Sequence, residues 1–243
     1  MVGKTSGGNK RRKSTATRQA VAKAAKLIRA RMAGSPGAPL ATRGFGGGYR
    51  SMGELKYFDV YTGGVTNVTA TTWNFVLLNG IAQGTDNIQR IGKKIMMKSL
   101  LFNGNFYNSF GTSLSAPGGC LGRFVIVYDL QANGGALPSG TDVFKLNTVH
   151  SALNLDNRER FRIITDFRKQ VGAFKTDSSG LTTGSPQNAY WSKYRKLNHE
   201  TIYKGTGGTS ADITTGALYL AYCVDTELTC SMEYYIRLRY VDP

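Results

Sequence analysis

Residue types able to perform catalysis are present in this sequence, but their spacing does not join them into a reaction centre. The two histidines, His150 and His199, stand far apart, and neither belongs to an HExxH zinc motif. No GxSxG nucleophile occurs, and Gly92-Lys-Lys-Ile95 lacks the glycine loop and the hydroxyl of a phosphate-binding loop. The sequence therefore predicts that the chain is not an enzyme and carries no cofactor.

Three other segments resemble catalytic or phosphate-binding motifs only superficially. The glycines at 44–48 follow a linker and not a strand, and those at 205–208 lead into Thr, Ser and Asp, a loop composition. Asp177-Ser-Ser-Gly180 is typical of a turn, and no partner carboxylate for an aspartic-protease site is visible. We interpret all three as loops.

The chemistry that the sequence does concentrate is positive charge at its N-terminal end. Of the 31 Lys and Arg residues, twelve lie within residues 1–50, and no acid precedes Glu54. The rest of the chain has nineteen basic (31 − 12) and fifteen acidic residues, a net charge of only +4 out of +16. This arm is predicted to bind nucleic acid. Its candidate contacts are Lys4, Lys10, Arg11, Arg12, Lys13, Arg18, Lys23, Lys26, Arg29, Arg31 and Arg43.

The composition of the arm also indicates how it binds. Because no aromatic residue precedes Phe45, the arm cannot stack on bases, and its contacts should tolerate any sequence. If the whole arm engages a single strand, log K should fall with log[salt] at a slope of about −6 to −8. Two alternatives stay open: a solvated basic tail without an ordered ligand, and a mitochondrial transit peptide. The compact cluster Lys10–Lys13 favours a nucleic-acid or nuclear-import patch.

The arm divides into three parts before the main domain begins. After the polar residues 1–14, an Ala-rich segment from Ser14 or Thr15 to Met32 has apolar residues at helical spacing, which predicts a short basic helix. Residues 34–50, rich in Gly and Pro, read as a flexible tether. We therefore place the domains at 1–50 and 51–243.

Beyond Met52 the pattern changes to period two, with β-branched and aromatic residues between turn-forming clusters. Eight strands are predicted, at roughly 54–61, 71–78, 94–107, 122–129, 160–173, 191–204, 217–225 and 230–242. The long connections favour an all-β, eight-stranded antiparallel jelly roll over a meander. An immunoglobulin-like sandwich is the alternative, but the Cys…Trp…Cys spacing is missing. One short helix is expected within 142–156.

A second basic set lies inside the predicted β domain. On a strand, Arg158, Arg160 and Arg162 would share one face, as a positive stripe. The stripe either faces nucleic acid, with Arg160 and Arg162 as contacts, or pairs with acids across a subunit contact. Near Lys193, Arg195 and Lys196, three aromatic residues either stack on a base or belong to the core or an interface. These aromatic residues are Tyr190, Trp191 and Tyr194. The remaining members of the basic set are Arg90, Lys93, Lys94, Lys98, Arg168 and Lys169.

Cysteines and apolar runs bear on the compartment. Cys120, Cys223 and Cys230 cannot all pair internally, so a disulfide framework is unexpected and a reducing compartment fits better. No apolar run approaches a membrane span, and the N-terminus lacks the pattern of a secretory signal. We expect no membrane partner.

Several segments, in this order, resemble viral capsid proteins. Residues 9–14, Asn-Lys-Arg-Arg-Lys-Ser, and 84–92, Gly-Thr-Asp-Asn-Ile-Gln-Arg-Ile-Gly, are similar to the satellite tobacco necrosis virus coat protein. Residues 123–129, Arg-Phe-Val-Ile-Val-Tyr-Asp, Gly-rich 133–140 and 160–166, Arg-Phe-Arg-Ile-Ile-Thr-Asp, look more like capsid proteins of small circular Rep-encoding single-stranded DNA viruses. The likeness spans about residues 9–242.

This resemblance implies a single jelly roll, about sixty copies of which form a T=1 icosahedral shell with the arms pointing inward. The implied partners are a viral single-stranded genome, DNA favoured over RNA, and further copies of the chain. The implied locations are the virion and, during assembly, the host nucleus. Structural calcium at subunit contacts would follow from the resemblance, but no ligands can be assigned. The sequence identifies no host receptor.

Two other functions remain open at this stage. One is a non-viral, single-stranded nucleic-acid-binding β-barrel protein with a basic tail, which would bind nucleic acid without residues 1–50. The other is a carbohydrate-binding or hydrolytic jelly-roll enzyme, which is disfavoured because no acid–base or metal constellation is present.

Overall fold

The computed structural model describes most of the chain beyond the arm. The described residues are 54–62, 66–67, 72–108, 119–132, 135–172, 174–176, 182–184, 188–225 and 230–242. The predicted basic arm, its helix and its tether lie outside them, so the domain boundary at residue 50 stays a prediction. Within the described residues, no helix is long and apolar enough to cross a membrane.

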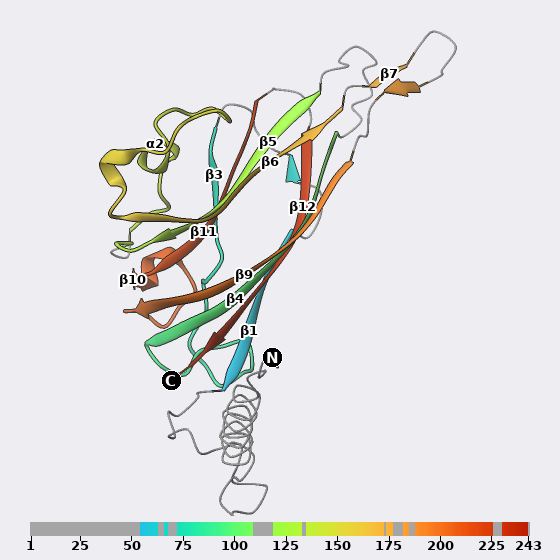
Figure 1. The fold of residues 1–243 in the computed structure, drawn as a ribbon. Coiled ribbons are helices and arrows are strands. Elements are labelled where there is room, and N and C mark those ends of the chain that lie inside the picture. Colours follow the sequence, from blue (N-terminus) through green and yellow to red (C-terminus); the bar gives the residue numbers. More distant parts are fainter. Residues whose placement is uncertain are drawn as a thin grey trace, which may run out of the picture. The chain divides into compact units, whose positions relative to one another are not determined.

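Two antiparallel sheets face each other in the β domain (Figure 1). The six-stranded sheet has the order β1 (Leu55–Tyr61), β12 (Cys230–Val241), β4 (Lys94–Asn108), β9 (Asn188–Tyr203) and β10 (Ile213–Thr215), and β2 (Thr66–Asn67) also pairs with β12. The four-stranded sheet has the order β3 (Asn74–Leu77), β11 (Ala217–Val224), β5 (Cys120–Asp129) and β6 (Phe161–Val171). A separate hairpin pairs β7 (Phe174–Thr176) with β8 (Thr182–Gly184).

The path of the chain between the two sheets identifies the architecture. It crosses from β1 to β3, back to β4, over to β5 and β6, back to β9, over to β11 and back to β12. Repeated crossing between two sheets with this strand order is a jelly roll. All eight predicted strands are present, with ends within about three residues of the predicted ones, so the predicted fold class is confirmed. The short strands β2, β7, β8 and β10 were not predicted.

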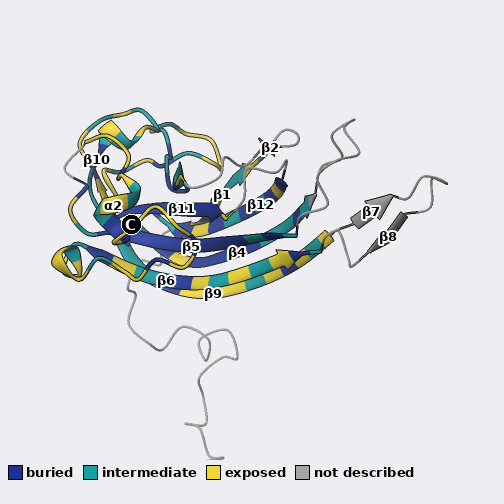
Figure 2. Cartoon of the chain, turned by 90° about the horizontal axis from the view of Figure 1, so that it is seen from above, coloured by how far each residue is buried: buried dark blue, intermediate teal, exposed yellow. Residues whose placement is uncertain are grey.

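The core forms where the inward faces of the sheets meet. Along β12, buried residues from Met232 to Tyr240 alternate with more exposed ones, as the period-two pattern requires. Figure 2 shows the same alternation along β6 and β9. Four rings from four strands meet at the centre: Trp191 lies 4.7 Å from Phe124, 5.4 Å from Phe102 and 5.5 Å from Phe167, centroid to centroid. Edge-to-face and tilted rings of this kind stabilise the contact beyond their area alone.

A second apolar cluster covers the outer side of the four-stranded sheet. There β5 and β11 present Val125, Val127 and Ala221, and the segment after β5 supplies Phe144 and other side chains that pack on them. Phe144 stacks on Trp73, with ring centroids 3.6 Å apart. The prediction that β5 is apolar on both faces is therefore confirmed.

The predicted short helix within 142–156 is wrong in position. The helix α2 is Gly140–Val143, only one turn, and a 3₁₀ turn η2 follows at Leu155–Asn157. Between them, Phe144 pairs with Leu153 as an isolated bridge. The apolar residues of this segment follow the surface of the sheet beneath them, and their spacing resembled a helix by chance.

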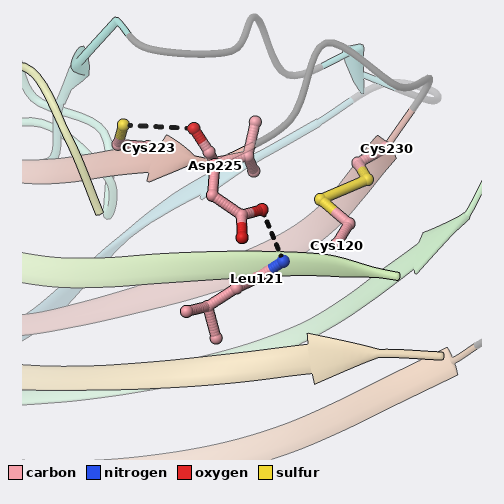
Figure 3. The surroundings of a disulfide bond; sticks show 6 residues. Cys120, Leu121, Cys223, Asp225 and Cys230 are labelled. Carbon is pink, nitrogen blue, oxygen red and sulfur yellow. Dashed lines mark hydrogen bonds between the residues drawn. A yellow bond between two sulfur atoms is a disulfide. The ribbon is translucent and has the colours of Figure 1, made fainter. Parts of the chain in front are cut away.

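A disulfide joins the two sheets at one end of the sandwich (Figure 3). It links Cys120, the first residue of β5, to Cys230, the first residue of β12, across a sequence separation of 110. The sequence made a disulfide framework unexpected and did not identify this single pair, which forms because the jelly-roll crossover brings distant strand ends together. Cys223 has no disulfide and is buried. Nearby, the Leu121 N–H donates to the Asp225 carboxylate at 2.8 Å.

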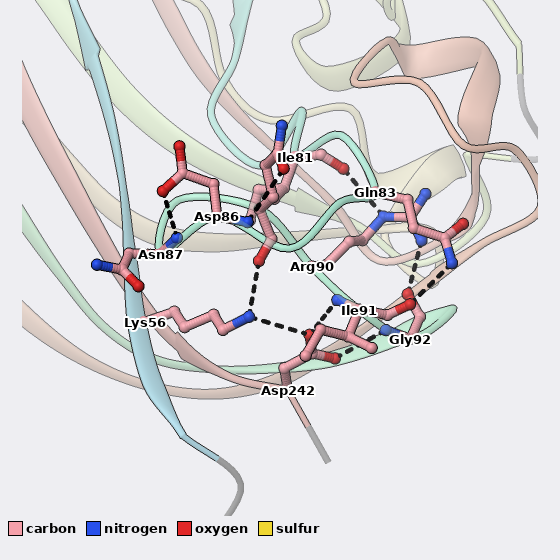
Figure 4. A network of polar contacts seen from close by, with 10 residues as sticks. Lys56, Ile81, Gln83, Asp86, Asn87, Arg90, Ile91, Gly92 and Asp242 are labelled. Carbon is pink, nitrogen blue, oxygen red and sulfur yellow. Dashed lines mark hydrogen bonds and ion pairs between the residues drawn. The ribbon is translucent and has the colours of Figure 1, made fainter.

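The loop before β4 is fixed by buried cations (Figure 4). The Arg90 side chain is fully buried, lies 4.0 Å over the Tyr203 ring, and donates to the carbonyls of Ile81 at 2.9 Å and Gly92 at 2.6 Å. Lys56 of β1 donates to the Gln89 carbonyl at 3.0 Å. Because these groups hold the loop together, Arg90, a member of the second basic set, is a structural residue.

Candidate nucleic-acid interface

The cations predicted to contact nucleic acid fall into two groups. Those of the arm, from Lys4 to Arg43, lie outside the described residues. Arg160 and Arg162 are described, but the predicted stripe with Arg158 is not formed, because β6 begins only at Phe161. Arg158 instead follows the 3₁₀ turn η2 as its C-cap.

Arg160 is engaged by a carboxylate of the same chain. Its Nε and Nη2 donate to the two carboxylate oxygens of Asp129, at 3.0 and 2.9 Å. The hydrogen bond to this almost fully buried carboxylate raises the pKa of Arg160. The ion pair fastens the start of β6 to the end of β5 and neutralises much of the Arg160 charge. Arg160 is therefore primarily a structural residue.

Arg162 lies at the open edge between β6 and β9. It is exposed and pairs in register with Tyr128 of β5. Across the edge, the Lys193 ammonium of β9 lies 4.6 Å over the Phe167 ring, and Arg195 Nη2 reaches Thr165 Oγ1 at 3.4 Å. The sequence did not predict this grouping, because the two strands meet only through the jelly-roll topology. Inward-pointing cations at a sheet edge also prevent unwanted strand pairing.

The outer face of the six-stranded sheet presents aromatic and polar side chains in cross-strand rows. In one row, Tyr61 of β1, Tyr235 of β12, Asn103 of β4 and Ser192 of β9 are register partners. The row on one side holds Glu233, Asn105 and Tyr190; the row on the other holds Asp59, Arg237, Leu101 and Tyr194. Tyr61, Tyr190 and Tyr194 are 64%, 68% and 53% exposed. The predicted aromatic group therefore splits, with Trp191 in the core and both tyrosines on the surface.

Charged groups on this face are partly paired. Arg237 donates to both oxygens of Asp59 at 2.8 Å, and the Tyr235 hydroxyl donates to the same carboxylate at 2.5 Å. The hydrogen bond from Arg237 is the largest influence on Asp59, and the pKa of that carboxyl is lowered. One row farther, Arg239 and Lys196 are exposed, and no described carboxylate forms an ion pair with either. These two cations can bind phosphate.

Neither the glycine loop 205–208 nor His199 forms a catalytic or metal site among the described residues. Asp212 follows the glycine loop 205–208. Its carboxylate accepts from the Thr209 N–H at 3.0 Å and so closes the turn that comes after the loop. The ring of His199 packs against that of Tyr128, with centroids 4.5 Å apart. No three His, Cys, Asp or Glu residues among those described gather as metal ligands. Asp177–Gly180 and Gly44–Gly48 lie outside the described residues, and structural calcium stays a prediction.

Comparison with known proteins identifies one family. Residues 5–242 match the Geminivirus coat protein/nuclear export factor BR1 family. No curated protein sequence matches the chain.

Two solved structures are among those similar to this chain. Desmodium yellow mottle tymovirus shares 8% identity, with a TM-score of 0.28, over 79% of this chain and 89% of its own. The 60-mer of the BFDV capsid protein shares 11% identity, with a TM-score of 0.25, over 79% of this chain and 94% of its own. The jelly-roll assignment rests on the strand order of this chain and not on these distant likenesses.

Proposed function

The chain belongs to the Geminivirus coat protein/nuclear export factor BR1 family, and we propose that copies of it assemble into an icosahedral shell that packages circular single-stranded DNA. The observation that carries this proposal is the family match over residues 5–242, almost the whole chain. Membership of a coat-protein family confirms that the chain is not an enzyme. It also overturns the alternative of a non-viral single-strand-binding protein.

The finer features of the proposal come from the resemblances in the sequence. We propose about sixty subunits in a T=1 shell, similar to satellite tobacco necrosis virus and to circular Rep-encoding DNA viruses. The complete jelly roll supports this, because its two sheets make a rigid block for packing side by side. The family description also names a nuclear export factor, and the cluster Lys10–Lys13 fits nuclear import. We therefore place part of the assembly route in the host nucleus.

The division of charge within the chain supports packaging by the arm. The arm holds twelve of the 31 basic residues and no acid, whereas Arg160, Arg123 and Arg237 of the β domain are paired with carboxylates. Charge without a counter-charge in its own chain needs an external polyanion. The arm neutralises phosphates without reading the base sequence, and the β domain forms the shell.

Expression of the full chain tests the proposal directly. Electron micrographs of the purified protein should show uniform particles, and nucleic acid extracted from native particles should be degraded by DNase and not by RNase. A monodisperse monomer at neutral pH and moderate salt would overturn the shell. RNase-sensitive contents would overturn the DNA assignment alone.

The role of the arm has its own test. Replacing Lys10, Arg11, Arg12 and Lys13 by Gln should make the log K–log[salt] slope shallower by about 3 for a single-stranded oligonucleotide. The control replaces Lys145 and Lys204, two exposed lysines of the β domain, by Gln. If the slope of the arm variant, like that of the control, equals the wild-type slope, a packaging role for the arm is contradicted.

A further inference from the structure

The disulfide between Cys120 and Cys230 lies where strand ends of both sheets meet (Figure 3). Cys120 begins β5 and pairs in register with Val171, the last residue of β6. Cys230 begins β12 and pairs with Asn108, the last residue of β4. The bond therefore joins the two sheets at the end where the chain leaves the sandwich through β4 and β6 and returns through β5 and β12.

Noncovalent contacts hold the two sheets together along the rest of the sandwich. Next to the bond, the rings of Phe106 of β4 and Phe124 of β5 meet edge to face, with centroids 5.5 Å apart. Toward the opposite end, the Tyr128 hydroxyl donates to the Glu200 carbonyl at 2.6 Å. These contacts and the ring cluster of Trp191 do not depend on the bond. We expect the domain to stay folded when the bond is open, with this end of the sheets free to separate.

Both sulfur atoms are enclosed by the core. Cys120 and Cys230 are fully buried and belong to the main apolar cluster between the sheets. A free cysteine packs as a small apolar side chain, so the core accepts the pair either as two thiols or as a disulfide. Because an attacking thiolate must reach a sulfur atom, exchange proceeds only while this end of the sandwich is briefly open. The redox state of the pair therefore changes slowly.

Cys223 cannot take part in this exchange. It lies on β11 in register with Arg123, and it packs in the second apolar cluster, on the outer side of the four-stranded sheet. The sheet itself separates it from Cys120 and Cys230, which lie on the inner side. Because the chain has only these three cysteines, the bond is opened or closed by a thiol or disulfide from outside the chain.

The compartments through which a virus particle passes differ in redox state. Thiols are kept reduced in the cytosol and the nucleus, whereas disulfides persist on extracellular particles. Disulfides of cytosolic and nuclear proteins are usually transient or redox-sensing. The assembly route proposed above runs through the host nucleus, where this bond would be open. A domain that stays folded without the bond can assemble there and gain the bond later.

We propose that the Cys120–Cys230 pair is a redox switch of the shell. Subunits fold and assemble as dithiols inside the cell, the bond closes after the particle has left the cell, and the thiols of the next cell reopen it. The closed bond stabilises the released particle, and the open pair lets one end of each subunit loosen so that the shell can come apart. The proposal rests on the proposed function, since it requires a shell that is assembled in the nucleus.

Closure needs a disulfide of low molecular weight, such as oxidised glutathione, as the oxidant. The thiolate of one cysteine attacks this reagent, which gives a mixed disulfide and releases one thiolate. The thiolate of the other cysteine attacks the protein sulfur of the mixed disulfide, forms the Cys120–Cys230 bond and releases a second thiolate. The two cysteines thus lose two electrons to the reagent, and their two protons pass to the released thiolates. Reduced glutathione reopens the bond by the reverse steps.

The test uses particles of the full chain assembled in excess reduced glutathione. One half of the sample is then treated with oxidised glutathione, and free thiols in both halves are alkylated after denaturation and located by peptide mass spectrometry. All three cysteines should be alkylated in the reduced half, and Cys223 alone in the oxidised half. In a fixed concentration of urea, followed by light scattering, oxidised particles should survive at least about tenfold longer than reduced ones.

Two variants separate the bond from other effects of oxidation. Cys120→Ala/Cys230→Ala should form particles that dissociate at the rate of reduced wild-type particles in both conditions. Cys223→Ala is the matched control, because it removes a buried cysteine outside the bond and should keep the full difference between the two conditions. If the double variant does not fold, the comparison of reduced and oxidised wild-type particles still decides.

Four results would overturn the switch and leave the coat function intact. They are a Cys120–Cys230 bond that persists in excess reduced glutathione, no such bond after oxidation, particles that form only after oxidation, and equal lifetimes of reduced and oxidised particles. A chain that forms no particles in either redox state would reject the coat function, and the switch with it.

Discussion

The two outer faces of the sandwich are built from similar strands, but only one of them is covered by other segments of the described chain. On the four-stranded sheet, Trp73, Phe144 and Val149 form a second apolar cluster over β5 and β11. Beneath it, Arg123 is 5% exposed and donates to both oxygens of Asp166, at 2.9 and 2.6 Å. On the six-stranded sheet, no described segment covers the central strands in this way, and Tyr61 and Tyr190 remain on the surface.

This difference separates stabilising residues from binding residues. On the covered face the aromatic rings form a core. The buried Arg123 donates there to one carboxylate and two backbone carbonyls. The open face leaves Asn103 Oδ1 and Asn105 Oδ1 without partners among the described residues. Groups that satisfy one another contribute to stability, whereas exposed rings contribute little to it and are available for contact with a partner.

The largest expected effect concerns the disulfide that links the two sheets. Replacing Cys120 and Cys230 by Ser should lower the free energy of unfolding by up to about 5 kcal/mol, since the bond closes a loop across a separation of 110 residues. Thermal unfolding of the full chain would measure it, with Cys223→Ser as the control. A reductant should destabilise the wild type and leave the double variant unchanged; equal melting of all three proteins would contradict the link.

The next prediction compares one ring from each face. Phe144→Ala should cost about 3–5 kcal/mol, because it removes a buried ring that stacks on Trp73. Tyr190→Ala should change stability by less than about 0.5–1 kcal/mol, since that ring is mostly exposed. Denaturant unfolding of both variants gives the two values. Similar decreases in the free energy of unfolding would show that the rings of the open face also stabilise the fold, and would contradict the distinction between the two faces.

A thiol provides a third comparison. Cys223 belongs to the covered cluster, and burial raises the pKa of its thiol to about 11. At pH 8 its thiolate fraction is about 100-fold lower than that of an ordinary exposed thiol, so reaction with a disulfide reagent should slow by at least that factor. Tyr194→Cys in a Cys223→Ser background supplies a thiol on the open face. Equal reaction rates would mean that the covered face opens readily in solution.

The smallest expected effect is a pH dependence on the open face. The hydrogen bonds of Arg237 lower the pKa of Asp59, so this ion pair stabilises the fold above the ordinary carboxyl pKa of about 4. The stabilisation is lost as the pH falls through the lowered value. Asp59→Asn should reduce stability at pH 7 by less than about 1 kcal/mol and flatten the acid limb below the ordinary carboxyl pKa.

The control for that variant is Asp156→Asn, because the Lys145–Asp156 pair is 65% and 78% exposed. It should leave the acid limb unchanged. An identical acid limb in Asp59→Asn and the wild type would show that the Arg237 pair contributes no stability.

Local patterns allowed much of the fold to be predicted. The period-two runs gave all eight long strands, and the doubly apolar run 123–128 gave β5 at the centre of its sheet. The short pairings β7–β8 and β9–β10 were missed because three residues are too few for a periodic signal. The helix within 142–156 was misplaced, since apolar residues that cover a curved sheet need not follow either period.

The roles of individual basic side chains could not be read from the sequence. The basic set included Arg90, which is buried under a loop, and Arg160, which is held by Asp129. Lys and Arg look alike in a sequence whether they bind a carbonyl, a carboxylate or a phosphate. The disulfide was missed for a related reason, as the ends of β5 and β12 are distant in sequence and adjacent only in the jelly roll.

The sequence by itself determined two properties of this protein: the concentration of charge in residues 1–50 and the alternation that makes eight strands. Both follow from composition and from the fixed period of a β-strand. Only the tertiary structure decided which outer face is covered, and which side chains meet on the open face. Tyr61, Asn103 and Tyr190 come from three strands, and their meeting depends on strand order and register across the sheet. Those long-range pairings leave no local signal in the sequence.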